Sequence, residues 1–216
     1  AVASRLNESH FLPIKFASPV IIRLSLDDHQ GSKRSVSWTK IPGLDHVHNP
    51  LTCITFASRA LCGNKLWNSI VSLMRCNESN AQTESGDDEG IVLMGCQDGS
   101  LYCTIVTNGE PCKASKLLQL NGGEPILSLA LLRTESVEPK LMCFGALGTI
   151  AIICKSTSKN DDIDFVLKRL PFDGRWCSLA TVGYNGGPSN DTELLSIIGT
   201  TDSGKSYFCQ FSIDCQ

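Results

Sequence analysis

The segment Gly199–Ser206 has residue types and a spacing that could bind the phosphates of a nucleotide. It reads GTTDSGKS and matches G-x-x-x-x-G-K-[ST], in which backbone amides cradle phosphates, the lysine reaches them and the hydroxyl holds Mg²⁺. That chemistry requires a helix after the loop, whereas the next residues, SYFCQF, alternate between polar and apolar as a strand does. The pattern therefore favours a glycine-containing β-turn, with a P-loop nucleotide-binding protein as the alternative.

Histidine and cysteine side chains between residues 46 and 62 could be drawn as a metal cluster. His46 and His48 precede Cys53 and Cys62, but the chain has no C-x-x-C pair and this cysteine spacing is unusual for zinc. We interpret the histidines as loop residues and the thiols as core residues. A second group of thiols, Cys96, Cys103 and Cys112, likewise lacks a metal-ligand spacing, and we interpret the first two, on the two strands of one hairpin, as packing residues.

The remaining chemistry-bearing residues do not form a catalytic pattern. G-x-S-x-G is absent, and the acidic pairs lie in polar loops, at Asp27-Asp28, Asp87-Asp88 and Asp161-Asp162. Catalytic carboxylates are opposed across a cleft, whereas adjacent ones in a loop face water. We therefore predict no catalytic, cofactor-binding or metal-binding residues and no enzyme activity, and we interpret Trp38, Trp67 and Trp176 as packing residues.

A repeated hairpin pattern organises the chain. Ile91–Val106 has two apolar runs around Gln97-Asp98-Gly99-Ser100, and Asp-Gly between apolar runs is a strong hairpin signal. The order strand, glycine, turn, strand recurs in Leu141–Lys155 and Leu194–Phe211. Glycines that close the first strand recur about fifty residues apart, and a Ser-Leu pair precedes each hairpin, at Ser72-Leu73, Ser128-Leu129 and Ser178-Leu179.

Two markers at this period predict an all-β fold, as part of a β-propeller made of repeated four-stranded antiparallel blades. Residues 62–216 hold three clear units, and residues 1–61 form an irregular β segment that could hold part of a fourth. Asn77–Gly90 is polar and acidic, so we expect a disordered loop there. A closed propeller needs about four to eight blades, so further blades or a partner must complete it.

The segments outside the hairpins predict the other strands of these units. We expect strands at Phe11–Leu26, Val36–Ile41, Leu51–Ala57, Lys116–Leu120, Ile126–Leu132, Phe165–Leu170 and Trp176–Val182, with a loop at Tyr184–Asp191. Lys65–Arg75 suits either a strand or a short amphipathic helix. The Ser-Leu marker inside it favours a strand.

Composition limits the function. The chain has 216 residues, 42% hydrophobic and 19% charged, with a net charge of −3, which is ordinary for a globular protein. No broad basic face is present for nucleic acid, and no apolar run reaches the length of a membrane-spanning helix. The start lacks a signal-peptide pattern and an initiator Met, so we expect a fragment of a longer protein.

The eleven cysteines are odd in number, and most lie inside apolar runs. Free cysteine behaves there as a small buried hydrophobe, and persistent free thiols fit a reducing compartment, so we expect an intracellular protein. A secreted, glycosylated domain is the alternative, because glycosylation triplets begin at Asn7, Asn77 and Asn190.

The stretches VLMGCQDGSLYCTIV, LLQLNGGEPILSLALL and LMCFGALGTIAIICK resemble the family of the hundred-kilodalton Fanconi anaemia-associated protein. HFLPI and KLWNSIVSLM are similar to the same family in the same order, and the likeness covers roughly residues 10–156. The group B subunit of the Fanconi anaemia core complex has comparable hairpins and is a second candidate.

The resemblance implies a nuclear, non-enzymatic β-propeller scaffold of that core complex. Its expected partners are the Fanconi group B subunit and the RING-type ubiquitin ligase subunit, which support monoubiquitination of the DNA-clamp substrate in interstrand crosslink repair. No binding residue is transferred by the resemblance. A WD-type or other propeller adaptor of another intracellular complex is the alternative.

Overall fold

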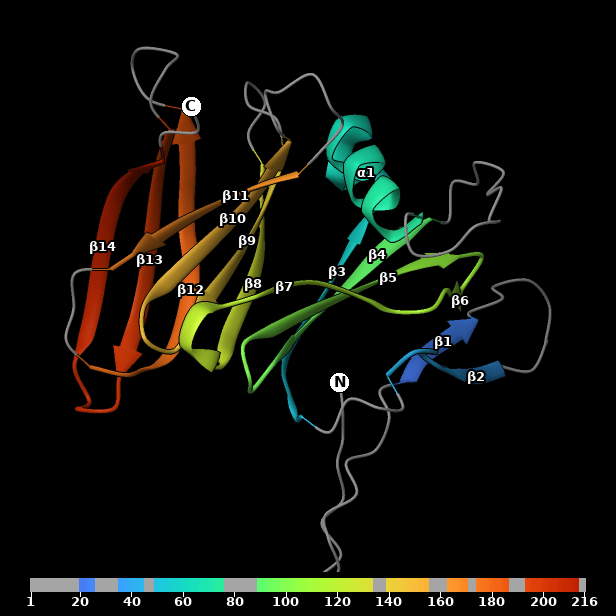
Figure 1. Ribbon diagram of the computed structural model, residues 1–216, viewed down its shortest axis with the longest axis horizontal. Helices are drawn as coiled ribbons and strands as arrows, with labels where there is room; N and C mark the ends of the chain where they lie inside the picture. The colour runs from blue at the N-terminus through green and yellow to red at the C-terminus, as the bar shows by residue number, and fades with distance from the viewer. Residues whose placement is uncertain are drawn as a thin grey trace, which may run out of the picture.

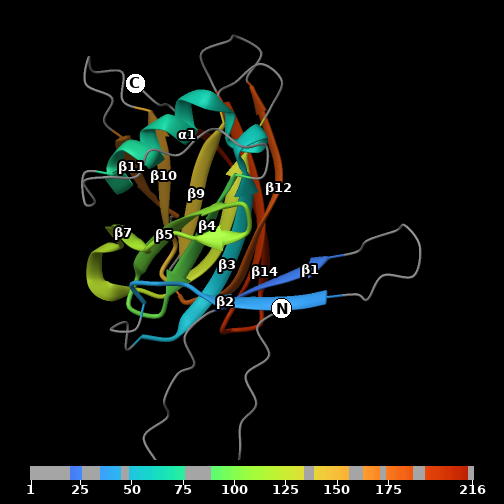
Figure 2. The same ribbon diagram turned by 90° about the vertical axis from the view of Figure 1, so that its right-hand side faces the viewer.

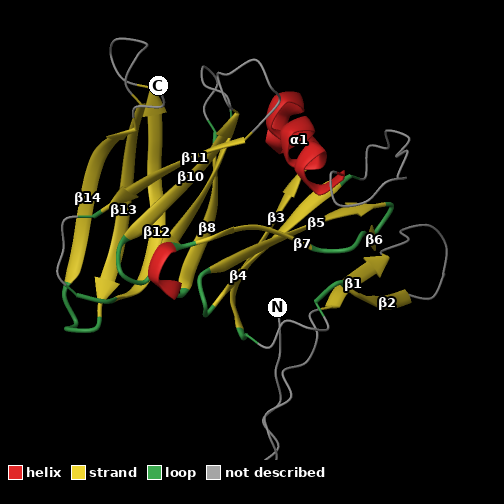
Figure 3. Cartoon of the chain, viewed as in Figure 1, coloured by secondary structure: helices red, strands yellow, loops and turns green. Residues whose placement is uncertain are grey.

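The computed structural model describes residues 20–25, 35–44, 49–75, 89–133, 139–155, 163–170, 174–186 and 193–213. The elements, in chain order, are β1 (Val20–Ser25), β2 (Ser35–Lys40), β3 (Leu51–Ser58), α1 (Arg59–Arg75), β4 (Gly90–Cys96), β5 (Ser100–Thr107), β6 (Glu110–Pro111), β7 (Ser115–Gln119), a 3-10 turn (Asn121–Gly123), β8 (Ile126–Leu132), β9 (Lys140–Gly145), β10 (Thr149–Lys155), β11 (Ile163–Arg169), β12 (Trp176–Gly186), β13 (Glu193–Thr201) and β14 (Ser206–Ile213) (Figures 1 and 3).

The strands form three antiparallel meanders and one small hairpin. Sheet 1 has the order β3-β4-β5, with β6 and β7 both paired to β5, sheet 2 has the order β8-β9-β10-β11, and sheet 3 has the order β12-β13-β14. Among the described strands, β1 and β2 pair with each other and with no third strand. The described residues are therefore mostly β-strand in antiparallel sheets, which agrees with the predicted all-β class. No described sheet closes on itself, and the propeller stays a prediction.

The three sheets pack face against face in chain order (Figures 1 and 2). A first core between sheets 1 and 2 includes Leu93 and Cys143, and a second core between sheets 2 and 3 includes Phe144 and Ile197. The first strand of sheet 2, β8, contacts the first strands of both neighbouring sheets, β3 and β12. Because strand side chains alternate between faces, each of these sheets can contribute to a different core on each side.

Equivalent turns join the second and third strands of all three sheets. Each turn contains a glycine with a positive φ: 80° at Gly99, 86° at Gly148 and 77° at Gly204. The amides of these glycines donate to carbonyl oxygens three residues earlier, at 3.2, 3.0 and 2.9 Å. Such a turn requires a residue in the left-handed region, and glycine adopts it without steric cost. This confirms the three hairpins predicted from sequence.

Two further features recur at the same places in the three sheets. In each sheet, the backbone amide of the residue after the second strand donates a hydrogen bond to the carbonyl oxygen of the residue before the first strand. The three bonds are Gln97 to Pro50 at 3.0 Å, Ala146 to Pro125 at 2.8 Å and Asp202 to Arg175 at 2.9 Å. The ladder between the first and second strands also shifts register near the start of each first strand, at Thr52, Leu127 and Cys177. The three sheets thus share one local design.

Replacing the turn glycines tests this design. Gly204→Ala should lower the free energy of unfolding by about 1–2 kcal/mol, because alanine is strained at a positive φ and the site is otherwise open. Gly99→Ala should cost more, since its added Cβ would also lie 2.7 Å from the Glu124 carbonyl oxygen. Urea denaturation of both variants measures the difference. Equal losses would show that the backbone contact at Gly99 is unimportant.

The predicted strand at Lys65–Arg75 is wrong, because these residues belong to helix α1. Its buried side chains recur at helical spacing, at Cys62, Leu66, Ile70 and Met74, and they pack on the core between sheets 1 and 2. The Ser72-Leu73 pair is therefore not a strand marker, and β3 is instead the first strand of sheet 1. The predicted boundary at residue 62 falls inside α1.

The ends of the segment that connects β3 with β4 are tied together. The Arg59 amide donates to the Glu89 carbonyl oxygen at 2.9 Å, and Arg59 Nη1 lies 2.8 Å from Glu89 Oε2. The guanidinium also lies over the Trp67 ring, 5.6 Å from its centroid. Glu89 and Gly90 are buried, so the disordered loop predicted for Asn77–Gly90 includes two residues too many at its C-terminal end. Residues 77–88, on which the disorder prediction falls, lie outside the described residues.

Most of the other predicted strands are confirmed. Leu51–Ala57, Val36–Ile41, Lys116–Leu120, Ile126–Leu132, Phe165–Leu170 and Trp176–Val182 correspond to β3, β2, β7, β8, β11 and β12, and β1 confirms part of Phe11–Leu26. Strand β12 continues to Gly186, so the loop predicted to begin at Tyr184 begins later. Strand β8 is fully buried only at its ends, Ile126 and Leu132.

Candidate functional site

The segment Gly199–Ser206 forms a β-hairpin turn in the structure. Gly199 and Thr201 lie in β13, and Ser206 begins β14 directly after the turn. The Thr201 amide donates to the Lys205 carbonyl oxygen at 3.0 Å. Because a strand and not a helix follows, the oriented amides of a helix N-terminus that bind phosphate in a P-loop are not provided here. The β-turn interpretation of this segment is confirmed.

The described residues contain no group of three or more side chains that could hold a metal ion. His46 and His48 lie outside the described residues, as do the three possible glycosylation sites. Cys53 contacts the backbone of β8 instead, with its Sγ 3.5 Å from the Ile126 carbonyl oxygen. The described cysteines are all free thiols.

Most described thiols are core residues, as predicted. Cys62, Cys96, Cys103 and Cys143 are buried. Burial raises the pKa of Cys62 to about 11 and the pKa of Cys143 to about 12. Cys177 lies in one of the apolar runs for which buried thiols were expected, but it is exposed, so that expectation is wrong for this residue. Its side chain follows the register shift at the start of β12, where strand alternation is broken.

Among the described thiols, an alkylating reagent at pH 8 should therefore modify Cys177 first. The raised pKa of Cys62, about 11, leaves it about a hundredfold less thiolate at this pH than its ordinary value of 9.0 would give, and Cys62 is also buried, so it should react much more slowly than the exposed Cys177. Peptide mapping by mass spectrometry reads the two rates.

The raised pKa values of Cys62 and Cys143 also affect the stability of the fold. As the pH rises, these thiols lose their protons in the unfolded chain before they lose them in the folded one. The free energy of unfolding should therefore fall as the pH rises from 9 towards 12.

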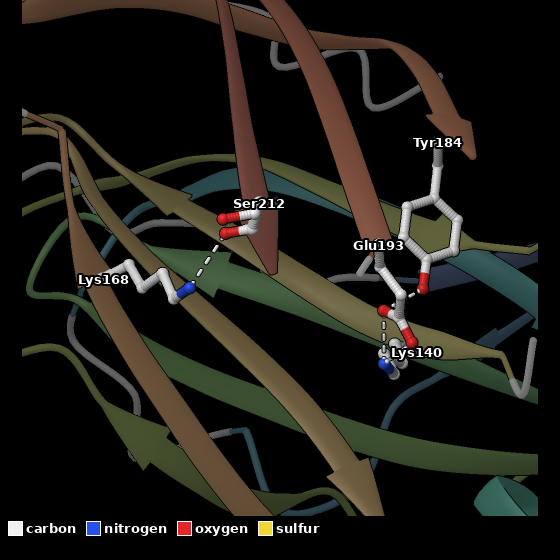
Figure 4. Close-up of polar contacts among 5 residues, drawn as sticks. All are labelled: Lys140, Lys168, Tyr184, Glu193 and Ser212. Atoms are coloured by element: carbon white, nitrogen blue, oxygen red, sulfur yellow. Dashed lines mark hydrogen bonds and ion pairs between the residues drawn. The ribbon is translucent and has the colours of Figure 1, made fainter. Parts of the chain in front are cut away.

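A charged cluster connects sheets 2 and 3 (Figure 4). Lys140 on β9 lies 2.5 Å from Glu193 on β13, and the Tyr184 hydroxyl on β12 donates to the same carboxylate. The Lys140 and Glu193 side chains are only 8% and 16% exposed, so each charge is balanced by its partner. Sequence reasoning missed this cluster, because its members are far apart in the chain. Its geometry fits a structural tie between the sheets.

A second contact between the same two sheets lies at the strand β14. Lys168 on β11 donates from Nζ to the Ser212 carbonyl oxygen at 2.9 Å (Figure 4). This bond uses a backbone acceptor of β14.

The face of sheet 3 that points away from sheet 2 carries exposed apolar side chains, and we call it the outer face of sheet 3. Ala180, Ile198 and Phe208 lie opposite one another across β12, β13 and β14. Ile198 is 47% exposed and Phe208 is 64% exposed, and Val182 nearby is 59% exposed. Serine and threonine surround these residues. This arrangement can bind a complementary protein surface, with Phe208 as the aromatic anchor.

The sequence contained a signal for this surface. In SYFCQFSI the inward residues of β14 are Tyr207, Cys209, Phe211 and Ile213, and the outward residues are Ser206, Phe208, Gln210 and Ser212. The outward set is polar except for Phe208. A large aromatic residue on an otherwise polar strand face is a reason to expect a binding surface.

The outer side of sheet 1 differs because other parts of the chain cover β4 and part of β5 there, although Ile54 on β3 stays 47% exposed. Ile41 and Leu44 pack on Val92 and Met94 and form a third core there. Phe56 on β3 remains 60% exposed, but its ring lies over Gly90. The outer face of sheet 3 is thus the better candidate for a binding surface among the described residues.

A scan of protein-family models and a search of curated proteins found no match to this chain. Among the described residues, no helix is both long and apolar enough to cross a membrane.

Proposed function

We propose that this chain is a non-enzymatic scaffold that binds other protein subunits through the outer face of sheet 3. The observation that supports this best is the exposed group of Val182, Ile198 and Phe208. Exposed aromatic and aliphatic residues surrounded by polar ones are typical of the energetically dominant part of a protein interface. The expected occupant is a β-sheet of a partner subunit, because the opposite face of the same sheet already packs against a sheet.

The finer fold that we propose is a stack of β-propeller blades. The equivalent turns, the equivalent register shifts and the adjacent first strands support it. In a propeller each blade packs against the next through its faces, so the outer face of sheet 3 would receive a further blade. A blade of a partner, or of a longer parent chain, would fulfil the same role.

The complex that we propose is the Fanconi anaemia core complex, on the resemblance described above. The partners would be the Fanconi group B subunit and the RING-type ubiquitin ligase subunit, and the location would be the nucleus. The scaffold would support monoubiquitination of the DNA-clamp substrate in crosslink repair. An adaptor role in a different assembly is the alternative that the experiment below separates.

Affinity purification from nuclear extract, read by mass spectrometry, tests this proposal. The wild-type chain should recover the group B and ligase subunits at near-stoichiometric levels, and Phe208→Asp should lose them. Phe56→Asp is the matched control, because it places the same charge at a similarly exposed phenylalanine of sheet 1. It should retain the partners.

The possible outcomes separate the parts of the proposal. Recovery of another stable assembly, lost in Phe208→Asp, would keep the scaffold and reject the Fanconi assignment. Equal recovery by all three proteins would reject the outer face of sheet 3 as the binding surface. Recovery of no partner would reject the scaffold role, and nucleotide binding to wild type and Lys205→Ala would be compared next.

A further inference from the structure

The strand β14 is the last strand of sheet 3, at a place where the two other sheets continue. In sheet 1, β7 pairs antiparallel with the third strand, β5, and in sheet 2, β11 pairs antiparallel with β10. Among the described residues no strand pairs with the far side of β14. Figure 1 shows β14 at the left-hand end of the molecule. Counted over the described residues, sheet 3 therefore lacks the strand that pairs with the third strand in each neighbouring sheet.

The fourth strands of the other sheets are anchored in the same way. The Leu120 amide, directly after β7, donates to the Gly99 carbonyl oxygen at 2.9 Å. The Leu170 amide, directly after β11, donates to the Gly148 carbonyl oxygen at 2.9 Å. Both leucine side chains are buried. The equivalent acceptor in sheet 3 is the carbonyl of Gly204.

The hydrogen-bonding pattern identifies the backbone groups of β14 that point outwards. The Thr201 amide bonds to the Lys205 carbonyl, and in an antiparallel ladder bonded and non-bonded residue pairs alternate from there. The β14 residues in the non-bonded pairs direct both their amide and their carbonyl away from β13; they are Ser206, Phe208, Gln210 and Ser212. The Lys168 bond to the Ser212 carbonyl agrees with this assignment.

The composition of β14 also differs from that of the other outer strands. Strand β7 contains Lys116, and β11 contains Lys168 and Arg169. Strand β14 has eight residues and none of them is charged. Proteins protect open sheet edges with charged residues, prolines or short strands, and β14 has none of these along Ser206–Phe211. An unprotected edge of this kind can form backbone hydrogen bonds with a further strand.

We propose that an extended segment of a partner polypeptide pairs antiparallel with β14 and forms the fourth strand of sheet 3. Its carboxyl-terminal end would lie at the turn, as in β7 and β11, with an apolar residue whose amide reaches the Gly204 carbonyl. The segment would alternate polar and apolar residues, because one face of β14 is packed and the other is exposed. This inference rests on the proposed scaffold function and specifies how the partner binds.

A synthetic peptide with the sequence of Ile163–Leu170 is the first probe, added in excess to the full chain. Amide hydrogen exchange should slow by at least about tenfold at Phe208 and Gln210 on β14, and not at Tyr207 and Cys209, which already bond to β13. The same peptide with proline in place of Val166 and Lys168 is the control. Unchanged exchange at Phe208 and Gln210 would overturn the proposal.

A backbone variant then tests the edge itself. Gln210→Pro removes one outward amide, and proline is tolerated on an edge strand whose amide faces solvent. Peptide protection and partner recovery should both be lost in Gln210→Pro and retained in Gln210→Ala. If exchange shows that Gln210→Pro unfolds β14, Gln210→Lys replaces it, because a lysine at the edge opposes strand addition.

The outcomes distinguish this inference from the scaffold proposal. Partner recovery that is lost in Phe208→Asp but unchanged in Gln210→Pro and Gln210→Lys would keep the scaffold and overturn pairing at the edge. Protection of Phe208 and Gln210 that increases with protein concentration alone, with a dimer in sedimentation, would make a second copy of the chain the occupant and overturn the assignment to a partner. Peptide protection without any recovered partner would support the edge while the scaffold proposal fails.

Discussion

Replacing Trp176 with alanine should lower the free energy of unfolding by about 3–5 kcal/mol. The Trp176 side chain is 1% exposed and lies in the core between sheets 2 and 3. Its ring packs edge-on against Tyr207, with centroids 5.7 Å apart. A Cβ on Gly199 would lie 2.8 Å from the indole, so the ring fills the space that the glycine leaves. Alanine would leave a cavity at this junction.

Urea denaturation followed by circular dichroism measures this loss. Phe208→Ala is the control, because it also removes an aromatic ring but from the exposed surface, and it should change the stability by within about 0.5 kcal/mol. A loss below about 1 kcal/mol in Trp176→Ala would mean that sheets 2 and 3 do not depend on this ring.

Replacing Lys140 with methionine should cost a similar amount, about 3–5 kcal/mol. The Glu193 side chain, which is only 16% exposed beside Lys140, would lose its counter-charge and keep the hydrogen bond from the Tyr184 hydroxyl. A charge that stays buried without its counter-charge is strongly destabilising. Lys168→Met is the control. Lys168 bonds a backbone carbonyl at an exposed site, so its loss should cost about 1 kcal/mol or less.

A double-mutant cycle shows whether the effect belongs to the pair. Lys140→Met combined with Glu193→Gln should be less destabilising than the sum of the two single changes, because the double variant has no unbalanced charge. Additive losses would indicate that Lys140 acts through the packing of its alkyl chain. Chemical denaturation of the four proteins gives the interaction energy.

The parts of the fold that the sequence predicted are local. Glycines at Gly99, Gly148 and Gly204 allow the turns, and the apolar runs beside them form the strands that the turns connect. Both signals lie within a few residues of the structure they produce. The helix α1 was missed because a Ser-Leu pair was given more weight than the spacing of Leu66, Ile70 and Met74, which is helical.

The parts that could not be predicted depend on distant residues. The pairing of Lys140 with Glu193 follows from how sheets 2 and 3 pack, and nothing near either residue indicates it. The exposure of Phe208 follows from strand alternation, so the sequence could have predicted it once the buried face of β14 was known. The cover on the outer side of sheet 1 likewise requires the position of Ile41 and Leu44.

The bonds between Arg59 and Glu89 hold together the two ends of the segment between β3 and β4. Because its two ends are held by their own contacts, the length between residues 76 and 88 can change without pulling on either strand. The free-energy cost of the entropy lost on closing a flexible loop rises slowly, by about 0.6 kcal/mol for each doubling of the loop length. This position is therefore where the chain can accept insertions over evolutionary time, and where a reporter domain can be placed with little effect on the sheets.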